Sequence, residues 1–304
     1  MDSLKQAVQA YGSRHANRDG LAPTPVPGLL MKYIEAPRGN FQAISRPLIV
    51  LVLQGAKSMI VGREERILSA GQTGIVSADM PMVTRILQAS TSQPYLAIGV
   101  ELEIAILCDV ASELGVTRPK RPPVARNLFA QDTEVAALDC MSRLMHLIDR
   151  PEAIRLLRPG IMWELSYWLL SGQHGASLLE LCDPARHASR LASAIAILRA
   201  EYRSRIPIEL LAAAAGMSLS VFHKHFKRMT SLTPGQYQKR LRLVEARRLM
   251  LEDDASASSA AFAVGYESVS QFTREYGRLF QAPPKRDTLR VRSEPDSKAR
   301  VRKD

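Results

Sequence analysis

The chain has 304 residues, a length that favours two domains, and a formal net charge of +11 at pH 7. Residues 1–184 hold equal numbers of acidic and basic side chains, whereas residues 185–290 hold 18 Lys and Arg against 9 Asp and Glu. A neutral domain beside a basic one is typical of a sensor joined to a nucleic-acid binder. Every apolar run is too short to cross a membrane, and the N-terminus lacks a signal-peptide core, so we expect a cytoplasmic protein with no membrane partner.

The first part of the chain reads as a strand-rich domain. Residues 1–27 predict a short polar helix followed by an extended, proline-bearing lead-in. From residue 29 to residue 103, short apolar runs alternate with glycine and proline. The candidate strands are 30–34, 48–53, 58–61, 65–68, 73–77, 83–87 and 95–103. Strands this closely spaced favour a small sandwich or barrel.

Polar side chains near the ends of these strands are candidates for contact with a small molecule. They are Asp79, Arg85, Tyr95 and Glu101. Polar positions in a barrel are also common without any function. The competing interpretations are a solvated strand residue for Arg85, packing for Tyr95 and an outward-facing charge for Glu101.

The residues that catalysis or metal binding would need are missing from the expected places. A metal-dependent barrel enzyme needs a cluster of histidines, yet no histidine lies between His15 and His146. The sequence contains no nucleophile elbow, P-loop or dinucleotide fingerprint. We therefore expect no catalytic residue, no metal, no cofactor and no enzymatic activity. The odd, widely spaced Cys108, Cys140 and Cys182 predict free buried thiols, with an electrophile-sensing Cys108 as the alternative.

Helical periodicity begins after residue 103. Helices are predicted at 104–114, 132–148 and 155–170, and Pro159-Gly160 is expected to break or restart the last one. The 132–148 helix either covers the barrel or pairs with its copy across a dimer. A basic, proline-bearing stretch at 118–123 is expected to be an exposed loop. We place the domain boundary near residue 180, so residues 1–180 form the first domain, with a barrel at about 29–103 and helices over 104–171.

Residues 207–280 contain one helical pattern twice. In the first copy an Ala-rich apolar stretch reaches Gly216, and a basic helix follows Ser218. In the second copy a shorter apolar stretch reaches Gly265, and a helix follows Ser268. Glycine suits such a turn because it enters φ > 0 without strain. This is the pattern of a helix-turn-helix unit, whose second helix enters the major groove of DNA.

Each predicted second helix has one buried and one exposed face. The pairs Phe222/Phe226 and Phe272/Tyr276 are spaced i, i+4 and mark the buried faces. The opposite faces carry residue types that bond to base edges and phosphates. They are Ser220, His223, Lys224, Lys227 and Arg228 in the first helix and Ser270, Gln271, Arg274 and Arg278 in the second. We expect Lys227, Arg228 and Arg278 to contact phosphate. We expect Arg274 and Gln271 to read bases in one groove, and Ser220, His223 and Lys224 to face bases in the other.

A helix is predicted between the two copies. Thr233, Pro234 and Gln236 form a capping box with proline at the first helical position, and the helix runs to Met250. Its length of about 25 Å suits two recognition helices in successive major grooves.

The chain from about residue 195 to residue 284 resembles the AraC/XylS family of bacterial transcription regulators. The residues that carry this resemblance are Leu211-Ala212, Gly216-Met217-Ser218, Phe226-Lys227, Thr233-Pro234, Gln236-Tyr237, Arg242-Leu243, Ala246-Arg247, Val264-Gly265-Tyr266, Ser270-Gln271-Phe272 and Phe280. The family usually has glycine after the last phenylalanine, where this chain has Gln281.

A second resemblance covers residues 48–102. The segments 52–57, 70–72, 79–81 and 94–97 are similar to the N-terminal domain of one AraC subgroup. That resemblance implies a cupin-like barrel that binds an effector or influences dimerisation.

Together these features predict an α+β protein. It has an N-terminal cupin-like β-barrel with flanking helices and a C-terminal all-α domain (185–290) with two helix-turn-helix motifs, followed by a disordered basic tail (291–304). The expected function is sequence-specific binding of double-stranded DNA, with activation of transcription under a small-molecule effector. The expected partners are a second copy of the chain, paired through residues 1–180, and RNA polymerase. The alternatives are a cupin-type enzyme and an effector-independent architectural DNA-binding protein.

Overall fold

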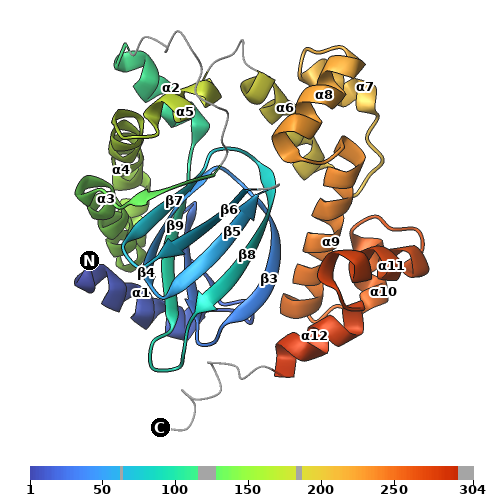
Figure 1. Ribbon diagram of the computed structural model, residues 1–304, viewed down its shortest axis with the longest axis horizontal. Coiled ribbons are helices and arrows are strands. Elements are labelled where there is room, and N and C mark those ends of the chain that lie inside the picture. Colours follow the sequence, from blue (N-terminus) through green and yellow to red (C-terminus); the bar gives the residue numbers. More distant parts are fainter. Residues whose placement is uncertain (62–63, 116–127, 183–186, 294–304) are drawn as a thin grey trace.

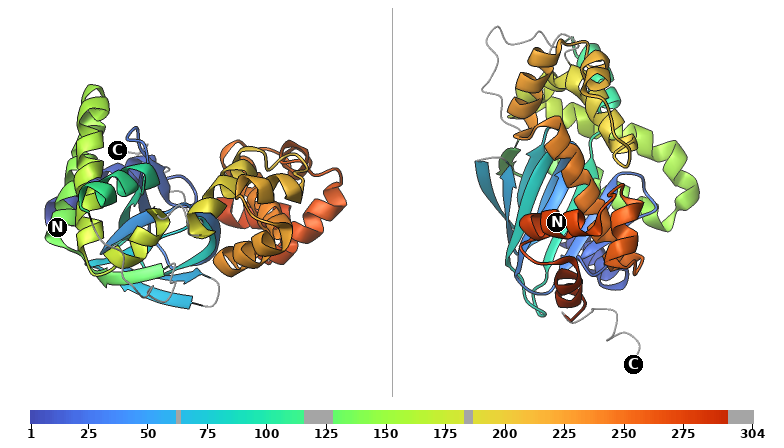
Figure 2. Two further views of the ribbon diagram at one scale, coloured as in Figure 1. Left: turned by 90° about the horizontal axis from the view of Figure 1, so that it is seen from above. Right: turned by 90° about the vertical axis from the view of Figure 1, so that its right-hand side faces the viewer.

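The computed structural model describes residues 1–61, 64–115, 128–182 and 187–293 (Figure 1). A strand-rich N-terminal domain lies beside an all-helical C-terminal domain, as Figure 2 shows from above. The expected basic loop at 118–123 lies outside the described residues, as does most of the expected tail. No helix in the described part of the chain is long and apolar enough to span a membrane.

The strands of the described chain form two antiparallel sheets. A six-stranded sheet has the order β1-β2-β9-β4-β7-β10, and a four-stranded sheet has the order β3-β8-β5-β6. The strands of the larger sheet are β1 (Leu21–Pro23), β2 (Leu29–Ile34), β9 (Tyr95–Glu101), β4 (Leu48–Gln54), β7 (Gln72–Val76) and β10 (Leu128–Asp132). Those of the smaller sheet are β3 (Arg38–Ser45), β8 (Met80–Gln88), β5 (Ala56–Val61) and β6 (Glu64–Ser69).

The two sheets pack face to face around one apolar core. Val50 and Val52 of β4 meet Met59 of β5, Leu68 of β6 and Ile86 of β8 there. The barrel that we expected is not closed, because the described strands pair within two separate sheets and no ladder joins one sheet to the other. The hydrophobic spacing predicted β2 and the strands from β4 to β9, missed β1, β3 and β10, and held no information on whether the sheet edges pair with one another.

Helices cover the other face of the larger sheet (Figure 1). They are α1 (Asp2–His15), α2 (Ile104–Glu113), α3 (Val135–His146), α4 (Pro151–Ser171) and α5 (Gly175–Leu179), with the 3-10 turns η1 (Leu147–Asp149) and η2 (Glu180–Cys182). The apolar side of α3 is buried against the domain through Cys140, Met141 and Leu144. Helix α4 continues through Pro159, so the expected break there is wrong; a proline removes one hydrogen bond, and the long helix around it persists.

Two of the cysteines are joined. Cys108 of α2 and Cys182 of η2 form a disulfide, with their Cα atoms 5.0 Å apart and a separation of 74 positions in sequence. The expectation of free thiols is therefore wrong for this pair, and with it the alternative of a free, electrophile-sensing Cys108. Sequence spacing could not show that folding brings α2 and η2 together. Cys140 remains a free, buried thiol.

The C-terminal domain consists of α6 (His187–Ala200), α7 (Ile208–Ala214), α8 (Leu219–Thr230), α9 (Pro234–Glu252), α10 (Ala257–Ala263), α11 (Val269–Phe280) and α12 (Pro284–Ser293). It has two separate apolar cores. The first lies among α6, α7, α8 and the start of α9, and the second lies among the rest of α9, α10 and α11. Helix α12 continues to Ser293, past the point at which we placed the start of the tail.

Candidate DNA-binding surface

The two helix-turn-helix units have the same backbone geometry at their turns. Gly216 and Gly265 adopt φ values of +58° and +87°. In the first turn Met217 N–H donates to the Ala212 carbonyl at 2.9 Å, and in the second Tyr266 N–H donates to the Ala261 carbonyl at 3.0 Å. The next helix starts three residues after Gly216 and four residues after Gly265, as the sequence indicated.

Arginine side chains hold both turns in place. Arg190 Nε donates to the Ala215 carbonyl at 2.8 Å, and Arg242 Nη1 donates to the Gly265 carbonyl at 2.8 Å. Arg242 also donates to the Tyr202 carbonyl at 2.6 Å, which ties the second turn to the end of α6. In the sequence, Arg242 stood out only as one of the residues that carry the AraC/XylS resemblance. Each arginine lies more than 20 residues before the turn that it holds, so no local sequence pattern indicates which carbonyls it will contact.

The faces that we predicted to be buried are buried. Phe222, Phe226, Phe272 and Tyr276 each have essentially no exposed side-chain surface. Ring centroids lie 5.4 Å apart in both the Phe222–Phe226 and the Phe272–Tyr276 pair. Aromatic pairs at this separation fix the orientation of a helix on its core, and the same orientation therefore turns the opposite face of each helix outward.

Helix α9 connects the two units as one continuous rod. Gln236 N–H donates to Thr233 Oγ1 at 3.3 Å, and Thr233 N–H donates to Gln236 Oε1 at 2.9 Å, so the predicted capping box is present. Tyr237 near its start belongs to the first core, and Met250 near its end belongs to the second. Both helix-turn-helix units are therefore fixed to a single helix.

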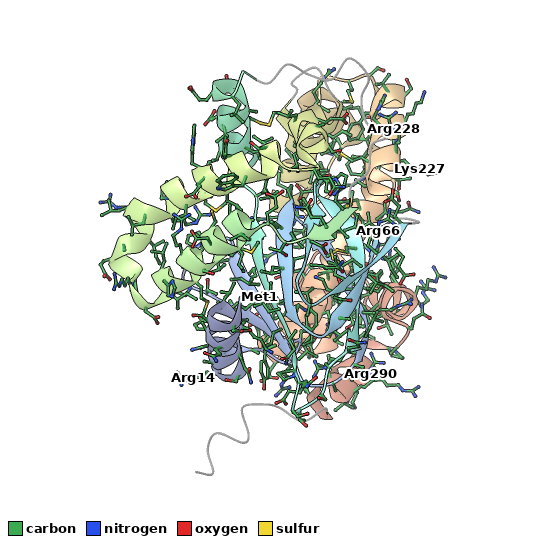
Figure 3. All side chains as sticks on the ribbon, turned by 60° about the vertical axis from the view of Figure 1, so that its left-hand side comes forward. Met1, Arg14, Arg66, Lys227, Arg228 and Arg290 are labelled. Carbon is green, nitrogen blue, oxygen red and sulfur yellow. A yellow bond between two sulfur atoms is a disulfide. The ribbon has the colours of Figure 1, made fainter. Side chains whose placement is uncertain are left out.

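All the candidate DNA-binding side chains lie on exposed faces of α8 and α11. They are Ser220, His223, Lys224, Lys227 and Arg228 on α8 and Ser270, Gln271, Arg274 and Arg278 on α11. Figure 3 shows Lys227 and Arg228 on the outer side of the helical domain. The amide of Gln271 lies 3.4 Å from Glu275 Oε1, so this side chain already has a partner on its own helix.

The cations on these two faces differ from several arginines of the domain that are engaged in ion pairs. Lys224, Lys227, Arg228, Arg274 and Arg278 form no ion pair with any residue in the described part of the chain. By contrast, Arg247 pairs with Asp287 at 2.8 Å and with Asp19 at 2.9 Å. The cations of the outer faces are thus available for an external anion.

A buried carboxylate anchors the end of the domain. Asp287 of α12 is 1% exposed and accepts hydrogen bonds from Tyr276 Oη at 2.8 Å, Arg247 Nε at 2.8 Å and Arg290 Nη2 at 2.9 Å. It joins α12 to α9 and α11. This anchor could not be predicted from sequence, because α12 lacks apolar periodicity and its buried carboxylate binds partners on distant helices.

The four candidate effector residues are divided among three places. Asp79 and Glu101 line a cleft of about 810 Å³ between the domains, together with Arg46 and Arg199. Arg46 pairs with Glu101 at 3.2 Å and Arg199 with Asp79 at 2.6 Å. Tyr95 is buried between the two sheets, and Arg85 is exposed on β8. No cluster of metal-binding side chains occurs among the described residues.

Both parts of the chain match models of known protein families. Residues 25–177 match the model of the AraC-type transcriptional regulator N-terminus, and residues 211–288 match a helix-turn-helix domain model. The chain is 31% identical over 110 residues to the HTH-type transcriptional activator RhaS of Citrobacter koseri, which covers 36% of this chain and 39% of RhaS. It is 32% identical over 98 residues to RhaS of Escherichia coli strain SE11, covering 32% and 35%. The chain thus spans well under half the length of these curated relatives.

The whole architecture resembles a solved one. ToxT from Vibrio cholerae strain SCE256 superposes with a TM-score of 0.58 over 86% of this chain and 94% of ToxT, at 8% sequence identity. The superposition establishes a shared fold, and at this low sequence identity it establishes nothing more. The likeness therefore covers the arrangement of a sheet domain beside a helical domain with two helix-turn-helix units.

Proposed function

The chain belongs to the AraC-type transcriptional regulators, and we propose on this premise that it reads an operator with α8 and α11 in successive major grooves. The observation that carries the proposal is the set of exposed, unpaired cations on these two helices. DNA carries one negative charge about every 1.7 Å along its axis, so cations without internal partners are suited to it. The α9 rod supports the same arrangement, since its 19 residues span about 28 Å.

The individual roles follow from the position of each side chain on its helix. Arg274 and Gln271 read bases in one groove, with Ser270 beside them at the start of α11. Ser220, His223 and Lys224 face bases in the other groove. Lys227, Arg228 and Arg278 contact phosphate. To contact a base, Gln271 must give up its hydrogen bond with Glu275. Its contribution to the binding free energy should therefore be smaller than that of Arg274.

A binding titration on variant operators tests these roles. Arg274→Ala should weaken binding by about 1–3 kcal/mol and relax the preference at one base position, because a bidentate base contact is lost. Lys227→Ala should weaken binding to all operators alike. It should also reduce the slope of log affinity against log salt concentration by the equivalent of about one phosphate contact. If Arg274→Ala left both the affinity and the base preference unchanged, the assignment of α11 would be wrong.

We also propose that the protein activates transcription through contact with RNA polymerase. The support is the RhaS relatives, whose names describe them as transcriptional activators. In-vitro transcription from a promoter that carries the selected operator is the test. Added protein should raise the transcript level, and a fall would indicate a repressor.

Small-molecule control would act at the contact between the domains. Arg199 of α6 pairs with Asp79 and donates to the Ser45 carbonyl at 3.2 Å. Arg240 of α9 donates to Gln42 Oε1 at 2.8 Å. The ToxT structure holds an unsaturated fatty acid, which supports a ligand-binding role for this fold. We propose that an effector changes these contacts, and thereby the DNA affinity, by binding two arrangements of the domains unequally.

The homodimer is proposed to form through α4 instead of α3. The apolar face of α3 is buried within its own domain, which removes our reason for choosing it. Helix α4 leaves four large side chains partly or mostly exposed: Leu156, Leu157, Trp163 and Tyr167. Leu156, Trp163 and Tyr167 share one face because they are spaced i, i+7, i+11. An exposed apolar stripe on the half of the chain that carries no net charge suits contact with a second copy.

A further inference from the structure

The two helix-turn-helix units meet at a second place besides the α9 rod. Residues 201–207 connect α6 to α7 in the first unit, and the Ile206 side chain of this segment lies in the first core. Tyr202, near the start of the same segment, packs against the second core. The segment thus reaches from one unit to the other. We call its contact with the second turn, at Gly265, the unit junction.

Arg242 of α9 binds both sides of the unit junction. Its Nη1 donates to the Gly265 carbonyl of the second turn at 2.8 Å. Its Nε donates to the Tyr202 carbonyl at 2.6 Å, and its Nη2 donates to the carbonyls of Arg203 and Ser204 at 3.0 and 3.1 Å. Because a guanidinium group is a rigid, planar set of donors, it holds these carbonyls in fixed positions relative to one another.

The two backbones are in direct contact at the unit junction. A Cβ atom on Gly265 would lie 2.0 Å from the Arg203 carbonyl oxygen, so only glycine fits there. Gln238 of α9 donates to the Ser204 carbonyl at 2.6 Å and to the Tyr202 carbonyl at 3.1 Å. Two side chains of α9 therefore bind the connecting segment, and one of them also binds the second turn.

The two arginines that hold the turns differ in what else they bind. Arg190 of α6 donates to the Ala215 carbonyl, and both residues belong to the first unit. Arg242 does the same for the second turn, but three of its four hydrogen bonds go to carbonyls of the first unit. Support of a turn needs only the bond to Gly265. The other bonds of Arg242 join one unit to the other.

The α9 rod sets the separation of the units, and the unit junction restricts their relative movement. Long helices bend smoothly, so a single helix between two cores leaves the units some freedom to tilt and twist. A second contact away from the rod removes that freedom, because any tilt or twist would pull the Tyr202 and Gly265 carbonyls apart. The Arg242 hydrogen bonds oppose that separation.

We propose that Arg242 is a positioning residue that makes the protein accept a single spacing between the two halves of its operator. This role rests on the proposed reading of DNA by α8 and α11. One added or removed base pair shifts one half-site by about 3.4 Å and turns it by about 35° around the DNA axis. Helix α11 can follow that shift only if the second unit moves relative to the first. Arg242 therefore determines spacing without reading a base.

Operators with altered spacing test the proposal on the full chain. The operator that the wild type selects keeps both blocks of preferred bases, and its spacer is lengthened or shortened by one base pair. The wild type should lose about ten-fold or more in affinity with either change, because the protein or the DNA must deform. Arg242→Met keeps the apolar stem and removes the donors, so its loss should be less than about three-fold. Single-base changes within a block should cost this variant the same factor as the wild type.

Two further variants separate the spacing role from general damage. Arg242→Lys should lie between the wild type and Arg242→Met, because an ammonium group has fewer donors than a guanidinium group. Arg248→Met is the matched control, since Arg248 pairs with Glu245 and Glu252 on its own helix and should keep the strict spacing. If circular dichroism shows Arg242→Met to be unfolded, Gln238→Leu takes its place and should also widen the accepted spacing.

The outcomes for the spacing role and for DNA reading are distinct. The proposal is overturned if Arg242→Met is as strict about spacing as the wild type, or if it loses spacing and base preference together. A wild type that binds all spacings equally overturns it as well. Two blocks with strict spacing in both proteins would contradict the role of Arg242 alone. A wild type that selects one block only would contradict reading by two helices.

Discussion

Basic side chains in this protein have three distinct uses. Arg199, Arg242 and Arg247 are bound to carbonyls or carboxylates inside the protein. Those on the outer faces of α8 and α11, such as Arg274, have no internal ion pair with a described residue. Lys57 is buried without an anion. The first use stabilises the fold, the second suits DNA, and the third lowers stability while the ammonium group is charged.

The buried Lys57 predicts an unusual dependence of stability on pH. Its pKa falls from 10.5 in the unfolded chain to about 7 in the folded one. Between these values the unfolded chain binds more protons, so stability rises with pH over that window. The contribution should be roughly 2 kcal/mol between pH 7 and pH 9. Urea unfolding at the two pH values should show this rise in the wild type, and an equal rise in Lys57→Met would contradict it.

The residue after α11 predicts a stabilising substitution. Gln281 ends the helix with φ of +58°, in the left-handed region that is costly for a residue with a Cβ. Its side chain recovers part of this cost by donating to the Arg278 carbonyl at 2.9 Å. Gln281→Gly should stabilise the protein by about 0.5–1 kcal/mol. Ala282→Gly, one position later, should give no gain; thermal unfolding of both variants decides.

At the level of elements, periodic stretches were predicted well and charged ones poorly. The sequence predicted the helix-turn-helix units, the α9 capping box and the strands from β4 to β9, because apolar spacing and glycine turns are local signals. It missed β3, an edge strand paired only with β8 whose other side lies along α9. Such a strand carries no apolar alternation. It also missed α12, which Asp287 anchors by hydrogen bonds.

The exposed face of α4 predicts the oligomeric state. Trp163 is 42% exposed and Leu156 is 72% exposed, and both lie on the stripe assigned to the dimer. Trp163→Lys should shift the full chain toward the monomer, because two like charges would meet across the contact. Sedimentation equilibrium at micromolar concentration measures this. Leu289→Lys, at a similarly exposed residue on α12, is the control; a wild type that is already monomeric would remove the proposal.

For the whole molecule, the helical domain predicts an independent reader of DNA. Its two cores are formed mainly by its own residues, and the candidate contact faces of α8 and α11 are exposed in the presence of the N-terminal domain. The fragment from residue 185 onward should fold and prefer the same operator, with weaker binding because a tethered second copy is lost. Circular dichroism and a titration on one operator check this. A folded fragment with a different base preference would show that the N-terminal domain shapes the reading surface.

The candidate sites differ in how much of them the sequence contains. The reading faces of α8 and α11 follow from helix geometry, so they could be predicted residue by residue. The arginine contacts at the turns and the Lys57–Lys32 pair depend on segments that are far apart in sequence. Lys32 influences the pKa of Lys57 only because the two sheets stack, and no local sequence pattern indicates that stacking. Tyr95 was identified as a candidate for ligand contact, and the structure buries it in the core between the sheets.

Selection of bound sites from a random DNA library measures the central claim most directly. The wild type should select two blocks of preferred bases about 10 base pairs apart, one for each major groove. Arg274→Ala should relax one block, and Lys224→Ala should relax the other. A single block, or the same positions relaxed by both variants, would contradict reading by two helices on one rod.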